Sequence, residues 1–510
     1  MSSVSDPSTE SSSLGPRLVL LSESFHRTLI SSPGEGHTSP VIHAIMTLAS
    51  SPKHEAILEV MRKAVTTYPL FASTIKTGVG CHGKMYWSIP SSTSLSTYDV
   101  APHVKERTLS VPGWGVAGSD DSQIDATNSN ALDKALRSYI GDELMDKSFD
   151  LSRGMFEVYV VKYKGEGGEI GRCDLVWRLH HAIGDGVLLS KVLENLCEKS
   201  AAVVEGDKVK KKVDGAKKRV KKKISTLTLV KNAVGCTVRT LMLPLSFADV
   251  RTHLKAPSTP GSLPPSKVYG SSSVWKVEDA KEAGRQFGGT VNDVVTAAIS
   301  KAMREYNLSK SCGVTRRGGK KLKVRALAVV NTRTMREETS AVEQFKRCEA
   351  TNEFSYVVPR LPLGEMGVRE RVEICRDEMT YLKSTPQASV IRSLNNLLRS
   401  AFGGSFVVSF NTRHVINKFH CFFSNLMGPT EKLSIAGVGI ERLSNFVHPM
   451  NYSLGVSIQS YAGDIVVNFS SDKGMVPEPD VIGRMADEAF RDICKEAKGG
   501  VGTVEVETRV

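Results

Sequence analysis

The chain has 510 residues, which is too long for one compact core and favours two domains. Hydrophobic residues make up 40% and charged residues 24%, as in soluble globular proteins, and no run of eighteen apolar residues predicts a membrane span. The net charge is +13, but the segment from Lys208 to Lys223 carries ten Lys or Arg against one Asp, so the remainder is nearly balanced and does not indicate a nucleic-acid-binding protein.

The cysteines and the N-terminus indicate an intracellular setting. Nine cysteines are scattered, an odd number, and none forms a CxxC pair, which favours reduced thiols in the cytosol over disulfides or a zinc site. Residues 1–17 are polar and Ser-rich without an apolar core segment, so we expect a disordered tail and no secretion signal.

Hydrophobic periodicity predicts the elements of the first half. Apolar side chains recur at helical spacing in two places, residues 41–50 and 54–73. Aromatic and β-branched residues predict strands at 84–89 and 156–163. A loop is predicted at residues 113–130, which are rich in Gly, Ser, Asp and Asn, and a further helix at 130–145.

Residues 201–265 are predicted to connect two lobes. They contain the basic segment, an apolar stretch interrupted by Lys231 and Arg239, and a Pro-rich end. Because charges interrupt it, the apolar stretch is more consistent with an interfacial or packed helix than with a membrane span.

The second half again mixes strands and helices. Thr290 and Asp293 are placed to cap a helix whose apolar face continues to Ala302. Further strands are predicted at 323–333, 419–426, 454–461 and 464–471, and helices at 371–383 and 479–497, with helix or loop at 336–347. With no internal repeat, the pattern predicts a two-lobed α/β or α+β fold.

The sequence HHAIGDG, at residues 180–186, stands between a predicted strand and a predicted helix. Leu175, Trp177 and Leu179 alternate along one side of the strand, and helical spacing begins at Val187. If the strand continues, His181 joins the apolar side and His180 the polar side.

His181 is a candidate general base, because neutral imidazole accepts a proton near pH 7. Asp185 is expected in the turn, where it can pair with an Arg or with backbone amides and so orient His181. Gly186 is expected to let the chain bend and to leave room for substrate. His180 is better suited to a surface or supporting role, and a purely structural role for His181 stays open.

Other catalytic patterns are absent from the sequence. It has no GxSxG, HExxH, GxxxxGK[ST] or CxxC. We therefore expect direct transfer assisted by one base, without a covalent intermediate, a metal or a cofactor.

HHAIGDG resembles the HHxxxDG signature of acyltransferases with the chloramphenicol-acetyltransferase-like fold. Three further segments resemble the wax ester synthase/diacylglycerol acyltransferase family: GGTVNDVVTAAISKAMREY, SNLMGP, and LGVSIQSYAGDIVVNFSSD followed by VPEPDVI. FDLSRGMFEVYVV is similar to a family strand, with Gly154 replacing the usual Pro and Phe156 the usual Trp, and Met427 replaces a Pro in SNLMGP. The plant HxxxD acyltransferases are less similar, because their DFGWG motif is missing.

The resemblance implies an N-terminal lobe at residues 18–200, a connection at 201–265, a C-terminal lobe at 266–497 and a tail at 498–510. Each lobe is expected to hold a mixed sheet with flanking helices, with HHxxxDG in a tunnel between them. By this resemblance His181 deprotonates a fatty alcohol or diacylglycerol that attacks acyl-CoA, and Asp185 is architectural. Asn292 and Asn425 are candidates for positioning or oxyanion contacts, with helix capping and a turn as their structural alternatives.

The resemblance also bears on partners and location. We expect acyl-CoA and a lipid acceptor as substrates, and a peripheral position on the cytoplasmic face of the endoplasmic reticulum, another internal membrane or a lipid droplet. The segment from Lys208 to Lys223 is a candidate contact to anionic lipid, with a solvated linker or nuclear targeting as alternatives. A related acyltransferase using a smaller alcohol or an amine, or a non-catalytic lipid-binding protein, stays open as an alternative function.

Overall fold

A computed structural model describes residues 16–20, 41–76, 86–112, 114, 121–145, 147–150, 152–199, 226–257, 266–349, 352–402, 404–449 and 452–499. The expectations for residues 1–15, for the segment from Lys208 to Lys223 and for residues 500–510 lie outside these ranges. Within them, no helix combines the length and the apolar character needed to cross a membrane.

The first lobe is built on a mixed seven-stranded sheet. Its strands, in spatial order, are β5 (Val104–Ser110), β6 (Phe156–Gly165), β7 (Gly168–His180), β2 (Val41–Leu48), β16 (Val438–Val447), β15 (Leu433–Ile435) and β8 (Glu198–Lys199). Beside it lies a small sheet of β1 (Arg17–Leu20), β4 (Tyr86–Ile89) and β3 (Thr74–Lys76), with the short helix α3 (Ser92–Ser96).

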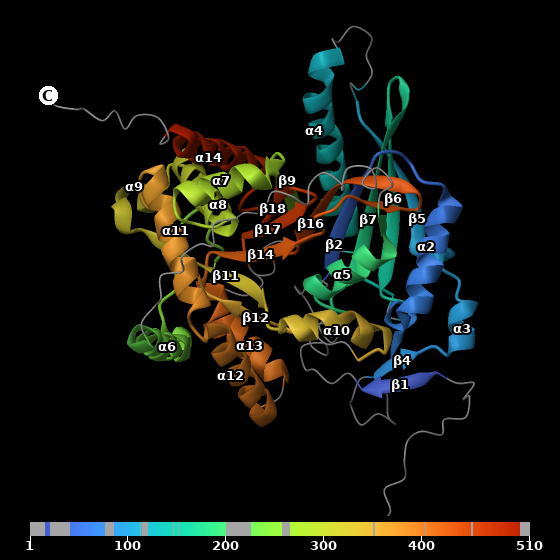
Figure 1. The fold of residues 1–510 in the computed structure, drawn as a ribbon, viewed down its shortest axis with the longest axis horizontal. Helices are drawn as coiled ribbons and strands as arrows, with labels where there is room; N and C mark the ends of the chain where they lie inside the picture. The colour runs from blue at the N-terminus through green and yellow to red at the C-terminus, as the bar shows by residue number, and fades with distance from the viewer. Residues whose placement is uncertain are drawn as a thin grey trace, which may run out of the picture.

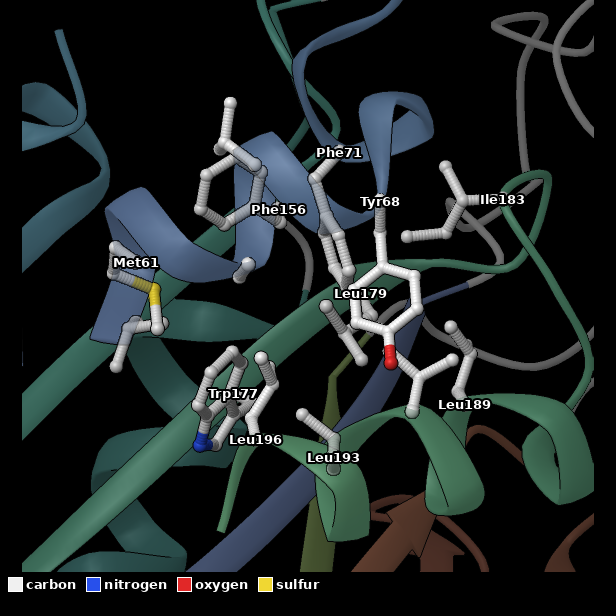
Figure 2. Packing of buried hydrophobic residues seen from close by; sticks show 14 of the residues in the cluster. Met61, Tyr68, Phe71, Phe156, Trp177, Leu179, Ile183, Leu189, Leu193 and Leu196 are labelled. Carbon is white, nitrogen blue, oxygen red and sulfur yellow. The ribbon is translucent and has the colours of Figure 1, made fainter. Parts of the chain in front are cut away.

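Leu175, Trp177 and Leu179 share one side of β7, as predicted, and the alternation separates two hydrophobic cores. Leu175, Trp177 and Leu179 pack with helices α2 (His54–Thr67) and α5 (Gly186–Leu196), whereas Val176 packs on the other face with α4 (Asp121–Tyr139). Figure 2 shows the α5 side chains Leu189, Leu193 and Leu196 directed toward Trp177 and Leu179. Helix α5 is thereby fixed to the strand that precedes it.

Two predictions in the first half are wrong. Residues 41–48 form strand β2 rather than a helix, because Val41, Ile42 and Ile45 are β-branched and the strand is enclosed between β7 and β16. Residues 121–130 belong to α4 rather than to a loop. The buried residues Leu132 and Leu136 anchor the helix, and extending an existing helix costs less than starting one.

The second lobe holds an eight-stranded mixed sheet, so the predicted two-lobed α/β fold is confirmed. Its main path is β10 (Trp275–Lys276), β18 (Asp464–Asp472), β17 (Leu454–Tyr461), β14 (Cys421–Met427), β11 (Lys323–Asn331) and β12 (Phe354–Val357). Strand β9 (Lys267–Ser271) pairs with β18, and β13 (Arg360–Pro362) pairs with β11.

Helices α7 (Val277–Gln286), α8 (Val291–Ser309), α11 (Val368–Lys383) and α14 (Pro479–Gly499) pack together on this sheet (Figure 1). Thr290 and Asp293 form the predicted capping box at the start of α8. The remaining helices are α6 (Thr226–Leu241), α9 (Gly313–Arg317), α10 (Met335–Lys346), α12 (Gln387–Phe402) and α13 (Gly404–His414).

Three elements of the second half, β15, β16 and α10, join the first lobe. Strand β16 lies beside β2, with Asn445 opposite Ala44, and extends the seven-stranded sheet (Figure 1). Helix α10 places Phe345 in the first core, with its ring 5.5 Å from Tyr68 and 5.9 Å from Phe71. The crossing of α10 brings Arg333, Asn352 and Phe354 close to the turn that follows β7.

Candidate active site

The HHAIGDG sequence connects the end of β7 to the start of α5. The strand ends at His180, so His181 lies in the turn, and the alternation that would have oriented His181 along a continuing strand does not apply. The backbone N–H of His180 donates to Met155 O at 3.1 Å, and the Ile183 N–H donates to His180 O at 3.1 Å. The turn is therefore compact and tied to the strand.

His180 is buried, with 3% of its surface exposed, and so does not occupy the surface position that was one expectation. Its Nδ1 accepts a hydrogen bond from the Ala182 backbone N–H at 3.1 Å, and its ring lies edge-on to Phe149 at 5.7 Å. Because Nδ1 accepts, the imidazole is neutral there. His180 thus holds the backbone next to His181.

His181 faces the second half of the chain. Its ring centroid lies 5.8 Å from that of Phe354, and its backbone carbonyl accepts from Asn352 Nδ2 at 3.2 Å. The residue keeps some exposed surface, but its Nδ1 is fully covered. Burial lowers the pKa of His181 below its ordinary value of 6.5, and the Asp185 carboxylate opposes this shift. At neutral pH the imidazole is uncharged and able to accept a proton.

Asp185 connects the turn to three other groups. Its Oδ1 accepts from the Leu188 N–H at 3.0 Å and so caps α5. Its Oδ2 accepts from the Glu353 N–H at 3.0 Å and forms an ion pair with Arg333 Nη2 at 2.6 Å. Both side chains of the ion pair are almost completely buried. Asp185 therefore joins the HHAIGDG turn to the second half of the chain.

Gly186 is the first residue of α5, so its backbone is helical and the expected role in bending the chain is not the reason for glycine here. A Cβ at this position would lie 3.4 Å from Leu426 on β14. This distance is ordinary van der Waals contact, so alanine would fit here, whereas a larger side chain would crowd Leu426.

A cavity of about 50 Å³ adjoins Gly186 between the lobes. Its lining is mainly apolar and comes from β2, α5, β14 and β16, including Ile42, Leu189 and Leu426. Asn445 also lines it and is 3% exposed, and neither atom of its side-chain amide has a hydrogen-bond partner among the described residues. The volume is smaller than an acyl chain, so accommodating lipid requires side chains or lobes to move.

Asn292 and Asn425 meet in the second lobe. The Asn425 Nδ2 donates to Asn292 Oδ1 at 2.9 Å. The capping box of α8 is formed by Thr290 and Asp293, so capping does not explain Asn292, and Asn425 lies within β14 rather than in a turn. The pair is joined to the site region through β14, whose Leu426 approaches Gly186.

Several residues of this site were not identified from the sequence. Arg333, Asn352 and Phe354 contact the HHAIGDG turn from positions more than 140 residues away, and Asn445 lines the cavity. An Arg partner was expected for Asp185, and the structure shows that it is Arg333. No local sequence pattern identified this particular Arg. In the described part of the chain, no group of three His, Cys, Asp or Glu is placed to hold a metal ion.

Comparisons with known proteins identify the family. The wax ester synthase/diacylglycerol acyltransferase catalytic domain matches residues 135–295, and the C-terminal domain of the same family matches residues 350–494, together more than half of the chain. Wax ester synthase/diacylglycerol acyltransferase 2 of Arabidopsis thaliana is 22% identical over 468 residues, covering 85% of this chain and 88% of the relative.

Solved structures support the same fold. The wax ester synthase/diacylglycerol acyltransferase from Marinobacter aquaeolei VT8 aligns with a TM-score of 0.60 at 14% identity, over 94% of this chain and 99% of its own. The first condensation domain of the calcium-dependent antibiotic synthetase aligns with a TM-score of 0.55 at 14% identity, over 97% and 99% of the two chains. At these identities the alignments establish the two-lobed fold.

Proposed function

Because the chain belongs to the wax ester synthase/diacylglycerol acyltransferase family, we propose that it is an acyl-CoA-dependent O-acyltransferase. The acyl group passes from the CoA thioester to the hydroxyl of a fatty alcohol or diacylglycerol, giving a wax ester or triacylglycerol. The apolar lining of the cavity beside Gly186 favours a lipid acceptor over a small polar one.

His181 acts as the general base in this proposal. Its Nδ1 is covered, so Nε2 accepts the proton of the acceptor hydroxyl while the oxygen attacks the thioester carbonyl. The carbon–sulfur bond then breaks, and the CoA thiolate takes up the proton held by His181. Each step uses groups of this chain and its two substrates, so the proposed reaction requires no cofactor.

The surrounding residues orient the base and its substrates. His180 and Asp185 hold the turn that carries His181, through the hydrogen bonds to Ala182 and Leu188 and the ion pair with Arg333. We assign Asn292 and Asn425 to positioning of the substrate or of the thioester oxygen, because their paired amides lie on the lobe opposite His181.

The observation that carries the proposal is the position of His181 at the junction of the lobes, in contact with Phe354 and Asn352 of the second half of the chain. The test incubates purified protein with radiolabelled acyl-CoA and a panel of acceptors: long-chain alcohol, diacylglycerol, short-chain alcohol and amine. We expect labelled wax ester or triacylglycerol. Product formed only with the short alcohol or the amine would favour the related acyltransferase, and no labelled product with any acceptor would favour a non-catalytic lipid-binding protein.

We further infer that the protein works at the cytoplasmic face of the endoplasmic reticulum, another internal membrane or a lipid droplet. Long-chain alcohols and diacylglycerol reside in such phases, so a peripheral enzyme there meets its acceptor at high concentration. The basic segment from Lys208 to Lys223 supports contact with anionic lipid, since each cation near the surface adds about 1 kcal/mol.

A further inference from the structure

Helix α6 carries apolar side chains on the face that points away from the protein. Residues 227, 230, 234, 238 and 241 fall on one face of a helix, and at these positions stand Leu227, Val230, Val234, Val238 and Leu241. They are between 50% and 80% exposed. We call these five residues the α6 stripe. Core packing would place such a stripe inward.

The opposite face of α6 is the one that packs on the protein. Cys236 and Thr240 are buried there, and Thr240 Oγ1 accepts from Gln387 Nε2 of α12 at 3.4 Å. The Arg239 guanidinium lies over the Tyr381 ring, 5.8 Å from its centroid. These contacts fix the orientation of α6, so the outward direction of the stripe is set by packing.

The apolar surface continues beyond α6. The turn that follows exposes Met242, Leu245 and Phe247, the last with 93% of its surface accessible. This turn also lies against α13. At the junction of α12 and α13, Phe402 and Phe406 are exposed and their rings lie 4.9 Å apart. Figure 1 shows these helices at the outer edge of the second lobe.

The three helices of this surface contain cations and no carboxylates. Neither Asp nor Glu occurs in α6, α12 or α13, whereas Lys231, Arg399 and Arg413 do. Arg239 and Arg392 of the same helices pair with Glu378 and Glu353 of neighbouring segments and so do not count toward this surface. In the sequence, α6 also follows closely on the basic segment from Lys208 to Lys223. An apolar face bordered by cations complements an anionic lipid surface.

We propose that the α6 stripe docks on the anionic surface of a lipid membrane, with α6 lying parallel to it. Charge decides against a second copy of this chain, because a symmetric contact would bring the cations of α6, α12 and α13 in the two copies together, and these helices hold no carboxylate to pair with them. The proposal deepens the peripheral location inferred above by naming the face that makes contact. Docking here would hold the second lobe, and with it the junction at His181, next to the supply of lipid acceptor.

The test is flotation of the full-length purified protein with two kinds of vesicle, phosphatidylcholine alone and phosphatidylcholine mixed with phosphatidylserine. The stripe variant combines Leu227→Gln, Val234→Gln and Val238→Gln. A matched control, Leu18→Gln with Val274→Gln, replaces apolar side chains that are similarly exposed, 55% and 41%, elsewhere on the surface.

The wild type and the control are expected to float with the mixed vesicles, less with neutral vesicles and less at high salt. The stripe variant should bind at least about ten-fold more weakly, since it loses three buried apolar contacts. Equal binding of the stripe variant and wild type, or no binding by the wild type, overturns the proposal. A wild-type dimer that the stripe variant converts to monomer overturns it too, in favour of a protein contact.

Flotation is independent of turnover. A His181→Ala variant should float like the wild type even though it transfers no acyl group. Loss of the transferase function and loss of membrane docking are therefore distinguishable outcomes.

Discussion

Replacing Asp185 by Asn tests the link between the HHAIGDG turn and the second half of the chain. Asn caps helices about as well as Asp, so the bond from the Leu188 N–H is retained. The ion pair is lost, and its side chains are only 6% and 5% exposed, so the Arg333 guanidinium loses the carboxylate that it contacts at 2.6 Å in a nearly water-free site. Breaking a buried pair in this way costs about 3–5 kcal/mol, and we expect this loss in the free energy of unfolding.

Removing the other partner should cost less. In Arg333→Met, Asp185 keeps both backbone donors, Leu188 and Glu353, so we expect a loss of about 1.5–3 kcal/mol, the range for a charged hydrogen bond. The double variant should lose less than the sum of the two, because the two single changes remove the same ion pair.

Urea unfolding of the four proteins measures these differences, provided that the unfolding slopes agree. The turnover number of Asp185→Asn should also fall by about 100-fold, because a displaced turn moves His181 away from its substrate. A stability change below about 1 kcal/mol in Asp185→Asn, or strictly additive single changes, would refute the role given to this ion pair.

Three further predictions concern the same site. The value of kcat/KM should rise with pH and level off, with its inflection below 6.5, because burial lowers the pKa of His181 and only the neutral imidazole accepts a proton; a pH–rate profile with its inflection above 6.5 contradicts this. Asn425→Ala, which removes the bond to Asn292, should lower kcat by about 10- to 100-fold with little loss of stability, and unchanged kcat excludes the positioning role. Gly186→Val, crowding Leu426, should raise KM for long-chain acceptors more than for short ones, and an equal rise for both contradicts the view that the acceptor passes this point.

Local patterns predicted much of the fold because they are set by local physics. The alternation on β7, the helical spacing after Val187 and the capping box at Thr290 all persist in the structure. The helix predicted at residues 41–50 is wrong because β2 is buried on both faces. Apolar side chains therefore stand on both sides of the strand, interrupted only by His43 and Thr47, and their spacing does not distinguish it from a helix.

The candidate site was predicted only within the segments that resemble the family. His181 and Asp185 were identified from one short segment, but Arg333 and Asn352 reach them from distant positions. Their contacts depend on α10 and β16 crossing between the lobes. Hydrophobic periodicity predicts helices and strands but does not predict which lobe they join. The outward orientation of the apolar face of α6 was not predicted either, since the sequence shows an amphipathic helix without showing which face packs.

The role of His181 as the base is tested most directly by single-turnover ester formation from a preformed mixture of enzyme, acyl-CoA and long-chain alcohol. We predict that His181→Ala forms ester at least about 100-fold more slowly than the wild type, while His180→Ala is less impaired, with acyl-CoA binding measured in parallel and unchanged. Ester formation by folded His181→Ala at a rate near that of the wild type would contradict the mechanism.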